Sequence, residues 1–171
     1  MLKIATITDD HVVCMHYWIP MICLRRWMYW TDITTDRIER ASMDGKSRTV
    51  LHSTGLSVAR ALTMDYENQV LYWADDAYSR IESSNPDGSN RLIVVTISSY
   101  YAPFAMTYYN GRLYWADTYY SYNRIFSTSV TTPSITSITS RLSYGLYGIQ
   151  VVAKERQPQG VCFLFISSHS C

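Results

Sequence analysis

The chain has 171 residues, of which 47% are hydrophobic and 17% are charged, and its formal net charge is +1. This length and composition are typical of a folded domain with a hydrophobic core, and they exclude a disordered polypeptide. The small net charge excludes a protein that captures nucleic acid or a membrane surface by charge alone.

Residues 1–27 form a divergent N-terminal segment. Within it, the stretch Val12–Leu24 is apolar but only 13 residues long and contains Pro20, so it is too short to cross a bilayer. Two aspartates precede it and no small-residue cleavage site follows it, which disfavours a secretory signal. We therefore expect no membrane insertion by this chain, and no leading strand ahead of residue 28.

From residue 28 onward, a short aromatic and acidic pattern recurs at a period just over 40 residues. The copies are Tyr29-Trp30-Thr31-Asp32, Tyr72-Trp73-Ala74-Asp75 and Tyr114-Trp115-Ala116-Asp117, spaced by 43 and 42 residues, and each is followed by an Arg-Ile pair that starts at Arg37, Arg80 or Arg124. A period of this length with four short apolar runs per unit indicates the four-stranded blade of a β-propeller.

The middle repeat shows what each unit requires. Its runs 61–66, 70–74, 80–85 and 91–97 read as four strands, and Asp87-Gly88 reads as a hairpin turn. Side chains alternate along a strand, so Leu71 and Trp73 should lie on one face and Tyr72 and Ala74 on the other. Because both faces are apolar, neighbouring blades must cover both.

The fold class predicted is therefore all-β. We expect four-stranded antiparallel blades at about 58–97 and 101–138, a partial blade at 28–52, and a strand near 147–153 that pairs with a blade. Trp30, Trp73 and Trp115 should be largely buried at equivalent positions.

The recurring aspartates and arginines allow two interpretations. Asp32, Asp75 and Asp117 could be ligands of a metal or a substrate, or each could cap a turn and form an ion pair worth about 0–1 kcal/mol with the following arginine. We favour the structural interpretation because the residues recur once per repeat. No metal site and no cofactor is expected.

These repeats resemble the YWTD (class B) repeats of the low-density-lipoprotein receptor family. The stretches RIERASMDGKSRTVLHSTGL, starting at Arg37, and RIESSNPDGSNR, starting at Arg80, are most similar to lipoprotein-receptor-related proteins and Wnt co-receptors. The resemblance covers about residues 27–160. It implies a partial six-bladed propeller with about three blades over 28–160, the last half of the ring.

The same resemblance implies a setting and partners. It places the chain outside the cell in a receptor ectodomain, with lipoprotein, Wnt-pathway or matrix proteins as ligands and the remaining blades of the propeller as neighbours. Gly148 to Gly160 looks like the segment that leads into an EGF-like module, so 161–171 would be the start of one, with Cys162 as its first cysteine. The usual Asn-Gly-Gly-Cys is absent, and the pairing of Cys162 with Cys171 stays open.

The loops between strands two and three, and between strand four and the next strand one, share one face of a propeller. By resemblance this face takes ligands. Candidate binding residues on these loops are Asp36, Arg60, Asp76, Tyr78, Tyr100, Tyr101, Tyr119 and Tyr120. In one loop the family often has Trp-Pro-Asn where this chain has Val58-Ala59-Arg60, which removes an aromatic anchor.

Two other functions compete with a receptor module. A nidogen-like matrix component uses the same repeats. A propeller hydrolase would need an axial metal, but the inner strands begin with Ala61-Leu62-Thr63 and Phe104-Ala105-Met106, which are poor ligands. We therefore expect no enzyme. His52 could act as an acid-triggered release switch or could be an ordinary surface histidine.

Overall fold

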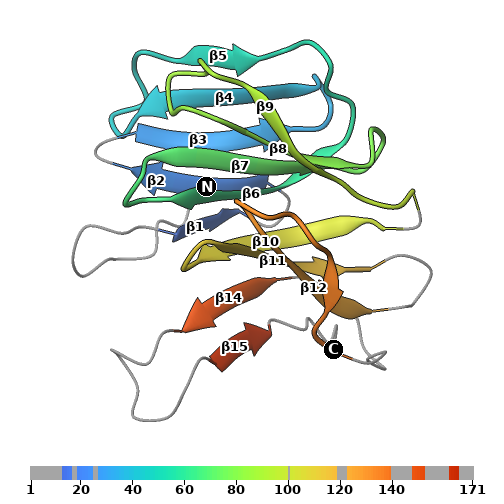
Figure 1. Ribbon diagram of the computed structural model, residues 1–171. Helices are drawn as coiled ribbons and strands as arrows, with labels where there is room; N and C mark the ends of the chain where they lie inside the picture. Colours follow the sequence, from blue (N-terminus) through green and yellow to red (C-terminus); the bar gives the residue numbers. More distant parts are fainter. Residues whose placement is uncertain are drawn as a thin grey trace, which may run out of the picture.

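The computed structural model describes residues 13–16, 19–24, 27–99, 101–118, 123–139, 148–152 and 162–165. Every regular element in these residues is a β-strand (Figure 1).

The strands form three sheets that correspond to the predicted blades. Blade 1 contains β1 (Val13–His16), β2 (Ile19–Leu24), β3 (Trp27–Asp32), β4 (Arg37–Ser42) and β5 (Thr49–His52). Blade 2 contains β6 (Ala59–Asp65), β7 (Val70–Asp75), β8 (Arg80–Ser84) and β9 (Leu92–Thr96). Blade 3 contains β10 (Pro103–Tyr109), β11 (Arg112–Asp117), β12 (Arg124–Ser129) and β13 (Thr136–Ser137).

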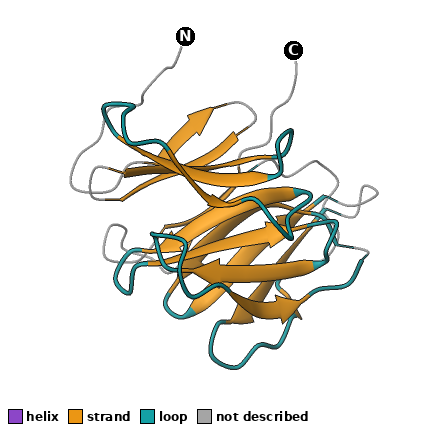
Figure 2. Cartoon of the chain, turned by 90° about the horizontal axis from the view of Figure 1, so that it is seen from above, coloured by secondary structure: helices purple, strands orange, loops and turns teal. Residues whose placement is uncertain are grey.

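Each blade is an antiparallel sheet whose strands follow one another in chain order. Blades 2 and 3 agree with the predicted ranges 58–97 and 101–138. The inner strands β2, β6, β10 and β14 (Ile149–Val152) lie beside one another in succession, so the sheets stand next to each other in the order of the chain (Figures 1 and 2).

The expectation that blade 1 lacks a leading strand is wrong. β2 pairs with β3 along its length, with Met21 opposite Trp30 and Leu24 opposite Trp27, and β1 adds a fifth strand beyond it. The segment lacks the Leu-x-x-Asp-Tyr pattern of residues 62–66, which begins in β6. A strand is held mainly by backbone hydrogen bonds and by packing, so a divergent apolar segment can fill this position.

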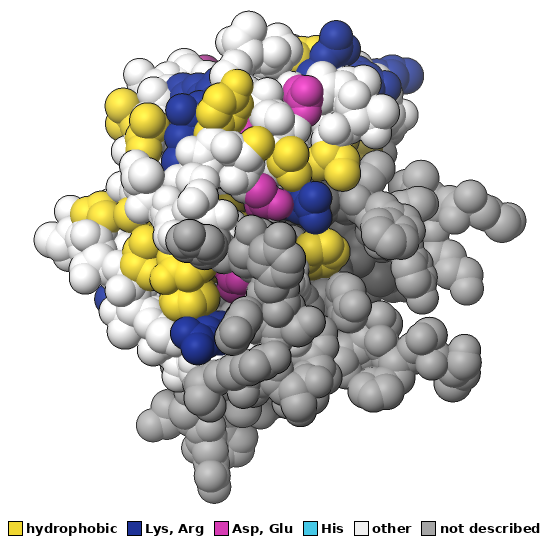
Figure 3. Space-filling view, turned by 90° about the vertical axis from the view of Figure 1, so that its right-hand side faces the viewer, with side chains coloured by type: hydrophobic (Ala, Val, Ile, Leu, Met, Phe, Trp, Pro, Cys, Tyr) yellow, Lys and Arg dark blue, Asp and Glu magenta, His cyan; other side chains and the backbone are white. Residues whose placement is uncertain are grey.

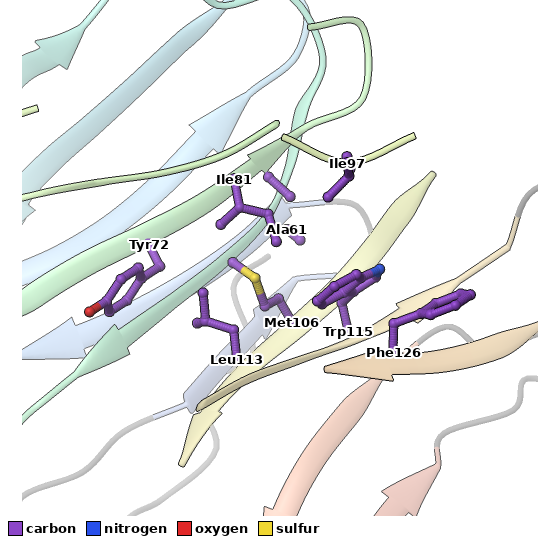
Figure 4. Close-up of a cluster of buried hydrophobic side chains, with 9 residues drawn as sticks. Ala61, Tyr72, Ile81, Ile97, Met106, Leu113, Trp115 and Phe126 are labelled. Carbon is purple, nitrogen blue, oxygen red and sulfur yellow. The ribbon is translucent and has the colours of Figure 1, made fainter. Parts of the chain in front are cut away.

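The Tyr-Trp dipeptide of each repeat divides its side chains between two interfaces, as the predicted alternation requires. Between blades 1 and 2, Tyr29 of the first repeat packs in one cluster with Leu71 and Trp73 of the second. Between blades 2 and 3, Tyr72 shares a cluster with Trp115 (Figure 4). The tyrosine therefore faces the following blade and the tryptophan faces the preceding blade.

This rule explains the burial of the three tryptophans. Trp73 and Trp115 are fully buried, as predicted. Trp30 is intermediate in exposure and is therefore less buried than the other two. Trp30 lies on the face of blade 1 that points away from blade 2, where the described residues supply no preceding blade.

Beyond blade 3, β14 begins a further sheet. Ile149 of β14 packs with Ala116 and Ile125 of blade 3. Its strand partner is β15 (Cys162–Phe165), with Val152 opposite Cys162. The predicted strand near 147–153 thus packs against a blade and pairs with β15, while Cys171 lies outside the described residues.

Candidate protein-binding face

One edge of the blades carries the loops singled out from the sequence. The strand register places Ala59, Asp75 and Arg80 side by side where β6 begins, β7 ends and β8 begins. The loop segments 33–36, 53–58, 76–79, 97–99 and 101–102 therefore open on the same side, which we call the loop face. Figure 3 views the molecule from this side and shows acidic and basic side chains next to hydrophobic ones.

Asp75 holds two of these loops together. Its side chain is fully buried and accepts backbone hydrogen bonds from Ser57 (2.8 Å), Val58 (3.2 Å) and Tyr78 (3.1 Å). In blade 3, Asp117 accepts one from Ala102 at 2.9 Å. A buried carboxylate is tolerated only where such donors surround it, and these donors fix the loops in place. The repeated aspartate thus orders the loop face.

The arginine of the motif does not pair with that aspartate in blade 2. Asp75 and Arg80 are opposite each other in the register, as expected, but the guanidinium of Arg80 lies 2.9 Å from Glu82. The carboxylate of Asp75 is already occupied by backbone amides. The ion pair expected across the hairpin is therefore replaced by one between two residues of β8.

Glu82 is the centre of a charged cluster that joins blade 2 to the loop leaving blade 1. Glu82 is buried and binds both Arg80 and Arg91, the latter at 2.7 Å. Arg91 also donates to the carbonyl oxygens of Thr54 (2.6 Å) and Gly55 (2.7 Å), and Arg80 donates to Gly55 at 2.9 Å. Charge-assisted bonds of this kind hold the loop 53–58 against blade 2.

The exposed part of the loop face is centred on Tyr78. This tyrosine is 48% exposed, and the guanidinium of Arg80 lies 4.7 Å from its ring centroid. Nearby, Arg60 forms an ion pair with Asp76 at 3.2 Å, and the Arg60 side chain is 42% exposed. An aromatic ring fixed by a cation and a half-exposed arginine are side chains that protein interfaces favour.

Asp76 is the titratable group of this region with the largest shift. Burial raises the pKa of Asp76 to about 7, against the opposing attraction of Arg60, and the neighbouring charges of Asp75 and Asp117 raise it further. The carboxyl group therefore changes its charge near neutral pH. This makes the strength of the Arg60–Asp76 pair dependent on pH.

The remaining candidate binding residues differ in their exposure to solvent. Asp36 is exposed and has a positive φ of 51° in its turn. Tyr101 is half-buried, because its ring packs 4.6 Å from that of Phe126. Tyr100, Tyr119 and Tyr120 lie outside the described residues.

His52 is buried, which corrects the expectation of a surface histidine. Its Nε2 atom lies 3.1 Å from the hydroxyl oxygen of Ser84, and its ring centroid lies 4.8 Å from that of Trp73. Burial lowers the pKa of His52 to about 4, and the nearby charge of Arg91 lowers it further, against the opposing effect of Glu82. His52 is therefore a neutral part of the interface between blades 1 and 2.

Sequence reasoning missed the buried glutamates. Glu39 in blade 1 binds Arg48, as Glu82 binds Arg91 in blade 2. The signal was present, since each glutamate follows the Arg-Ile pair of its repeat directly. Blade 3 has Phe126 at this position, which stacks 5.7 Å from Trp115.

The described residues contain no group of three or more His, Cys, Asp or Glu side chains that could hold a metal ion. In the same part of the chain, no helix has the length and apolar character needed to span a membrane.

Comparison with known proteins supports this description. Residues 26–66 match the model of the low-density lipoprotein receptor repeat class B. A solved structure described as "Crystal structure of Nidogen/Laminin Complex" is 22% identical with a TM-score of 0.72, covering 88% of this chain and 57% of that one. Virginiamycin B lyase from Staphylococcus aureus is 16% identical with a TM-score of 0.58, covering 72% of this chain and 41% of that one.

At these identities the likeness concerns the fold. The chain spans just over half of the nidogen-complex chain and less than half of the lyase chain that it matches. No curated protein sequence matches it.

Proposed function

We propose that this chain, a partial β-propeller whose residues 26–66 match the class B repeat, is an extracellular module that binds proteins through its loop face. The observation that carries the proposal is the ordered group around Tyr78. Arg80 fixes the exposed ring, Asp75 fixes the backbone beneath it, and the Arg60–Asp76 pair lies on the same face. Side chains that are already ordered lose little entropy on binding, which favours their use as anchors.

The proposed setting is the ectodomain of a cell-surface receptor of the lipoprotein or Wnt co-receptor type. The residues after Arg37 and after Arg80 support it, since they resemble that branch most closely. A nidogen-like matrix module is the alternative, and it is supported by the likeness to a chain from a nidogen–laminin complex. The two differ in the ligand bound: a lipoprotein or Wnt-pathway protein in the first case, and a matrix protein such as laminin in the second.

We propose no catalytic activity. The likeness to a lyase rests on the fold and does not carry a reaction to this chain. The starts of β6 and β10 support a binding role, because Ala61, Leu62 and Met106 are buried apolar side chains that serve the blade interfaces. Such positions offer neither a nucleophile nor a general base.

A binding measurement with paired variants tests the proposal. The 171-residue chain would be immobilised and exposed in separate experiments to purified laminin and to lipoprotein particles. Tyr78→Ala and Arg60→Ala should each weaken the binding of the true ligand by roughly tenfold or more, as anchors do. Glu67→Ala is the matched control, because Glu67 is exposed in the turn at the opposite edge of blade 2.

The ligand that binds decides between receptor and matrix roles. Binding that Glu67→Ala weakens as much as Tyr78→Ala would refute the loop face as the site. Absence of binding to both, with circular dichroism showing a folded β protein, would refute lipoprotein and laminin as the ligands.

A further inference from the structure

The hairpin between β12 and β13 departs from the pattern of the other two blades. Blades 1 and 2 turn at this point through an Asp-Gly pair with charged residues beside it. In blade 3, residues 126–140 contain no charge and no glycine, and ten of the fourteen residues from 127 to 140 are serine or threonine. Pro133 lies near the middle of this run. A run rich in serine and threonine that includes proline is typical of segments that carry O-linked sugars.

The structure divides these hydroxyl groups into two sets. The first set holds the turn together: Thr128 Oγ1 accepts a hydrogen bond from the amide of Ser134 at 3.0 Å. Ser129 Oγ accepts one from the amide of Thr132 at 3.3 Å. The second set comprises the hydroxyl groups of Thr132, Ser134 and Thr136, which belong to exposed residues and make no hydrogen bond with any described residue. The first set therefore fixes the backbone that presents the second set to solvent.

The hairpin lies at the edge of blade 3 that is opposite the loop face. The register places Arg124 beside Asp117 at the loop face, so the other end of β12, at Ser129, lies at the opposite edge. Residues 130–135 then lead to β13, whose outer edge has no strand partner in the described part of the chain. Ile138, directly after β13, is 43% exposed. A bulky polar group attached here would shield this strand edge and leave the loop face open.

We propose that Thr132, Ser134 and Thr136 form an O-glycosylation site, to which a transferase of the secretory pathway attaches N-acetylgalactosamine. The proposal rests on the extracellular setting proposed above. Pro133 favours an extended backbone at Thr132, and an extended peptide can lie along the binding groove of a modifying enzyme. No asparagine of the chain begins an Asn-x-Ser/Thr acceptor pattern, so the sugar is O-linked.

The transfer reaction needs only the exposed hydroxyl group and a nucleotide-activated sugar. The hydroxyl oxygen forms a bond to the anomeric carbon of the sugar. The bond between that carbon and the nucleoside diphosphate breaks, and the hydroxyl proton leaves with the departing diphosphate. No oxidant and no metal ligand from this chain is required.

Secretion of the 171-residue chain from animal cells behind a cleavable signal peptide, followed by mass spectrometry, tests the proposal. We expect intact masses that differ by whole sugar units. Electron-transfer fragmentation of the wild-type chain should place the sugars within residues 132–136. This mapping needs no substitution, so it decides the question even where a variant fails to fold. The triple variant Thr132→Val, Ser134→Ala, Thr136→Val should lose nearly all of the attached sugar.

A second triple variant is the matched control. Thr34→Val, Ser53→Ala, Thr54→Val removes the same kinds of hydroxyl group from exposed residues in the loops of blade 1, and it should keep the wild-type sugar content. Incubation of the purified chain with a polypeptide N-acetylgalactosaminyltransferase and its activated sugar repeats the measurement without secretion. We expect sugar on the same residues.

Three outcomes would overturn the proposal: a secreted chain without sugar, a purified chain that the transferase does not modify, or sugar retained in the first triple variant. These outcomes leave the binding proposal intact, because the first triple variant changes the edge opposite the loop face and should bind its ligand as the wild type does. A glycosylated chain that binds neither laminin nor lipoprotein would contradict the proposed ligands alone.

Discussion

Trp30, Trp73 and Trp115 occupy one position in three successive repeats, yet their surroundings differ. Trp73 lies between Arg91, whose guanidinium is 5.4 Å from its ring, and the buried side chains of blade 1. Trp30 has Arg48 at 5.5 Å over its ring and is half-buried. The same residue type therefore contributes differently, because burial rather than identity sets the energy of packing.

Replacing these two tryptophans by alanine should separate the contributions. Trp73→Ala should lower the free energy of unfolding by about 3–5 kcal/mol, because it leaves a cavity in a closed interface. Trp30→Ala should lower the free energy of unfolding by less than half of that amount, because Trp30 is less buried. Urea unfolding followed by far-ultraviolet circular dichroism measures both values. Equal losses would show that Trp30 is as well packed as Trp73.

His52 should make stability fall at acid pH. Its pKa is lowered to about 4 in the folded chain, while the unfolded chain has the ordinary value near 6.5. The unfolded state therefore binds the proton first, and stability is lost as the pH falls from about 6.5 to about 4. His52→Gln should remove this part of the pH dependence. Asp76 titrates in both proteins, so the difference between their unfolding curves isolates His52, and parallel curves from pH 7 to pH 4 would contradict this assignment.

At the scale of the strand, blades 2 and 3 cover their motif tryptophans with different side chains at equivalent repeat positions. Glu82 and Arg91 occupy the repeat positions that Phe126 and Ile135 hold in blade 3. Phe126 packs within the cluster between blades 2 and 3, and Ile135 packs against it. One blade covers its tryptophan with a buried ion pair, and the other covers it with apolar side chains.

This comparison gives a paired prediction. Glu82→Ala should destabilise the chain by about 3–5 kcal/mol, because two arginines lose a buried partner. The double variant Glu82→Phe, Arg91→Ile copies blade 3 and should lose less, since an apolar pair of suitable volume can replace a buried ion pair. Thermal melts of both variants and the wild type measure the order. A double variant that is less stable than the single one would show that the carbonyl contacts of Arg91 to Thr54 and Gly55 matter more than the ion pair.

Much of the strand arrangement could be predicted from the repeat, and the reason is the period itself. Three copies of Tyr-Trp at nearly equal spacing predict the positions of β3, β7 and β11, and Asp87-Gly88 predicts the turn between β8 and β9. β2 could not be found in this way, because Ile19–Leu24 contains Pro20 and lacks the aspartate that ends β6. Pairing with β3 stabilises this segment, and its unbroken apolar run shows no alternation from which a strand could be predicted.

The candidate site was predictable in outline only. Topology alone places Tyr78, Arg60 and Asp76 on one face, so the loop positions could be read from the strand order. The contacts between side chains on that face could not be predicted from the strand order. Arg80 pairs with Glu82 instead of Asp75, and Tyr101 packs on Phe126 instead of lying fully exposed. Which partner each side chain contacts depends on the distances between side chains in three dimensions, and a single sequence does not give those distances.

At the scale of the whole chain, the blades are stabilised in series, because each blade interface uses side chains from two repeats. Blade 2 contributes to both described interfaces, through Leu71 and Trp73 on one face and Tyr72 and Ala74 on the other. Blade 1 contributes to one of them. In such arrays the stability of a unit depends on its own folding and on its contacts with neighbours.

Amide hydrogen exchange should therefore show a gradient along the chain. The amides of β6, β7 and β8 should exchange most slowly, because opening blade 2 exposes two apolar interfaces. The amides of β3 and β4 should exchange faster, since opening blade 1 exposes only the interface that contains Tyr29 and Trp73. Mass spectrometry of peptic fragments gives the rates. In Trp73→Ala the interface between blades 1 and 2 is weakened, so protection should fall in both of these blades and least in β11 and β12. A longer polypeptide that places another YWTD blade against Trp30 should slow exchange in β3 and β4 selectively.

Uniform protection across the three blades would contradict the serial description. It would mean that the chain opens as one cooperative unit.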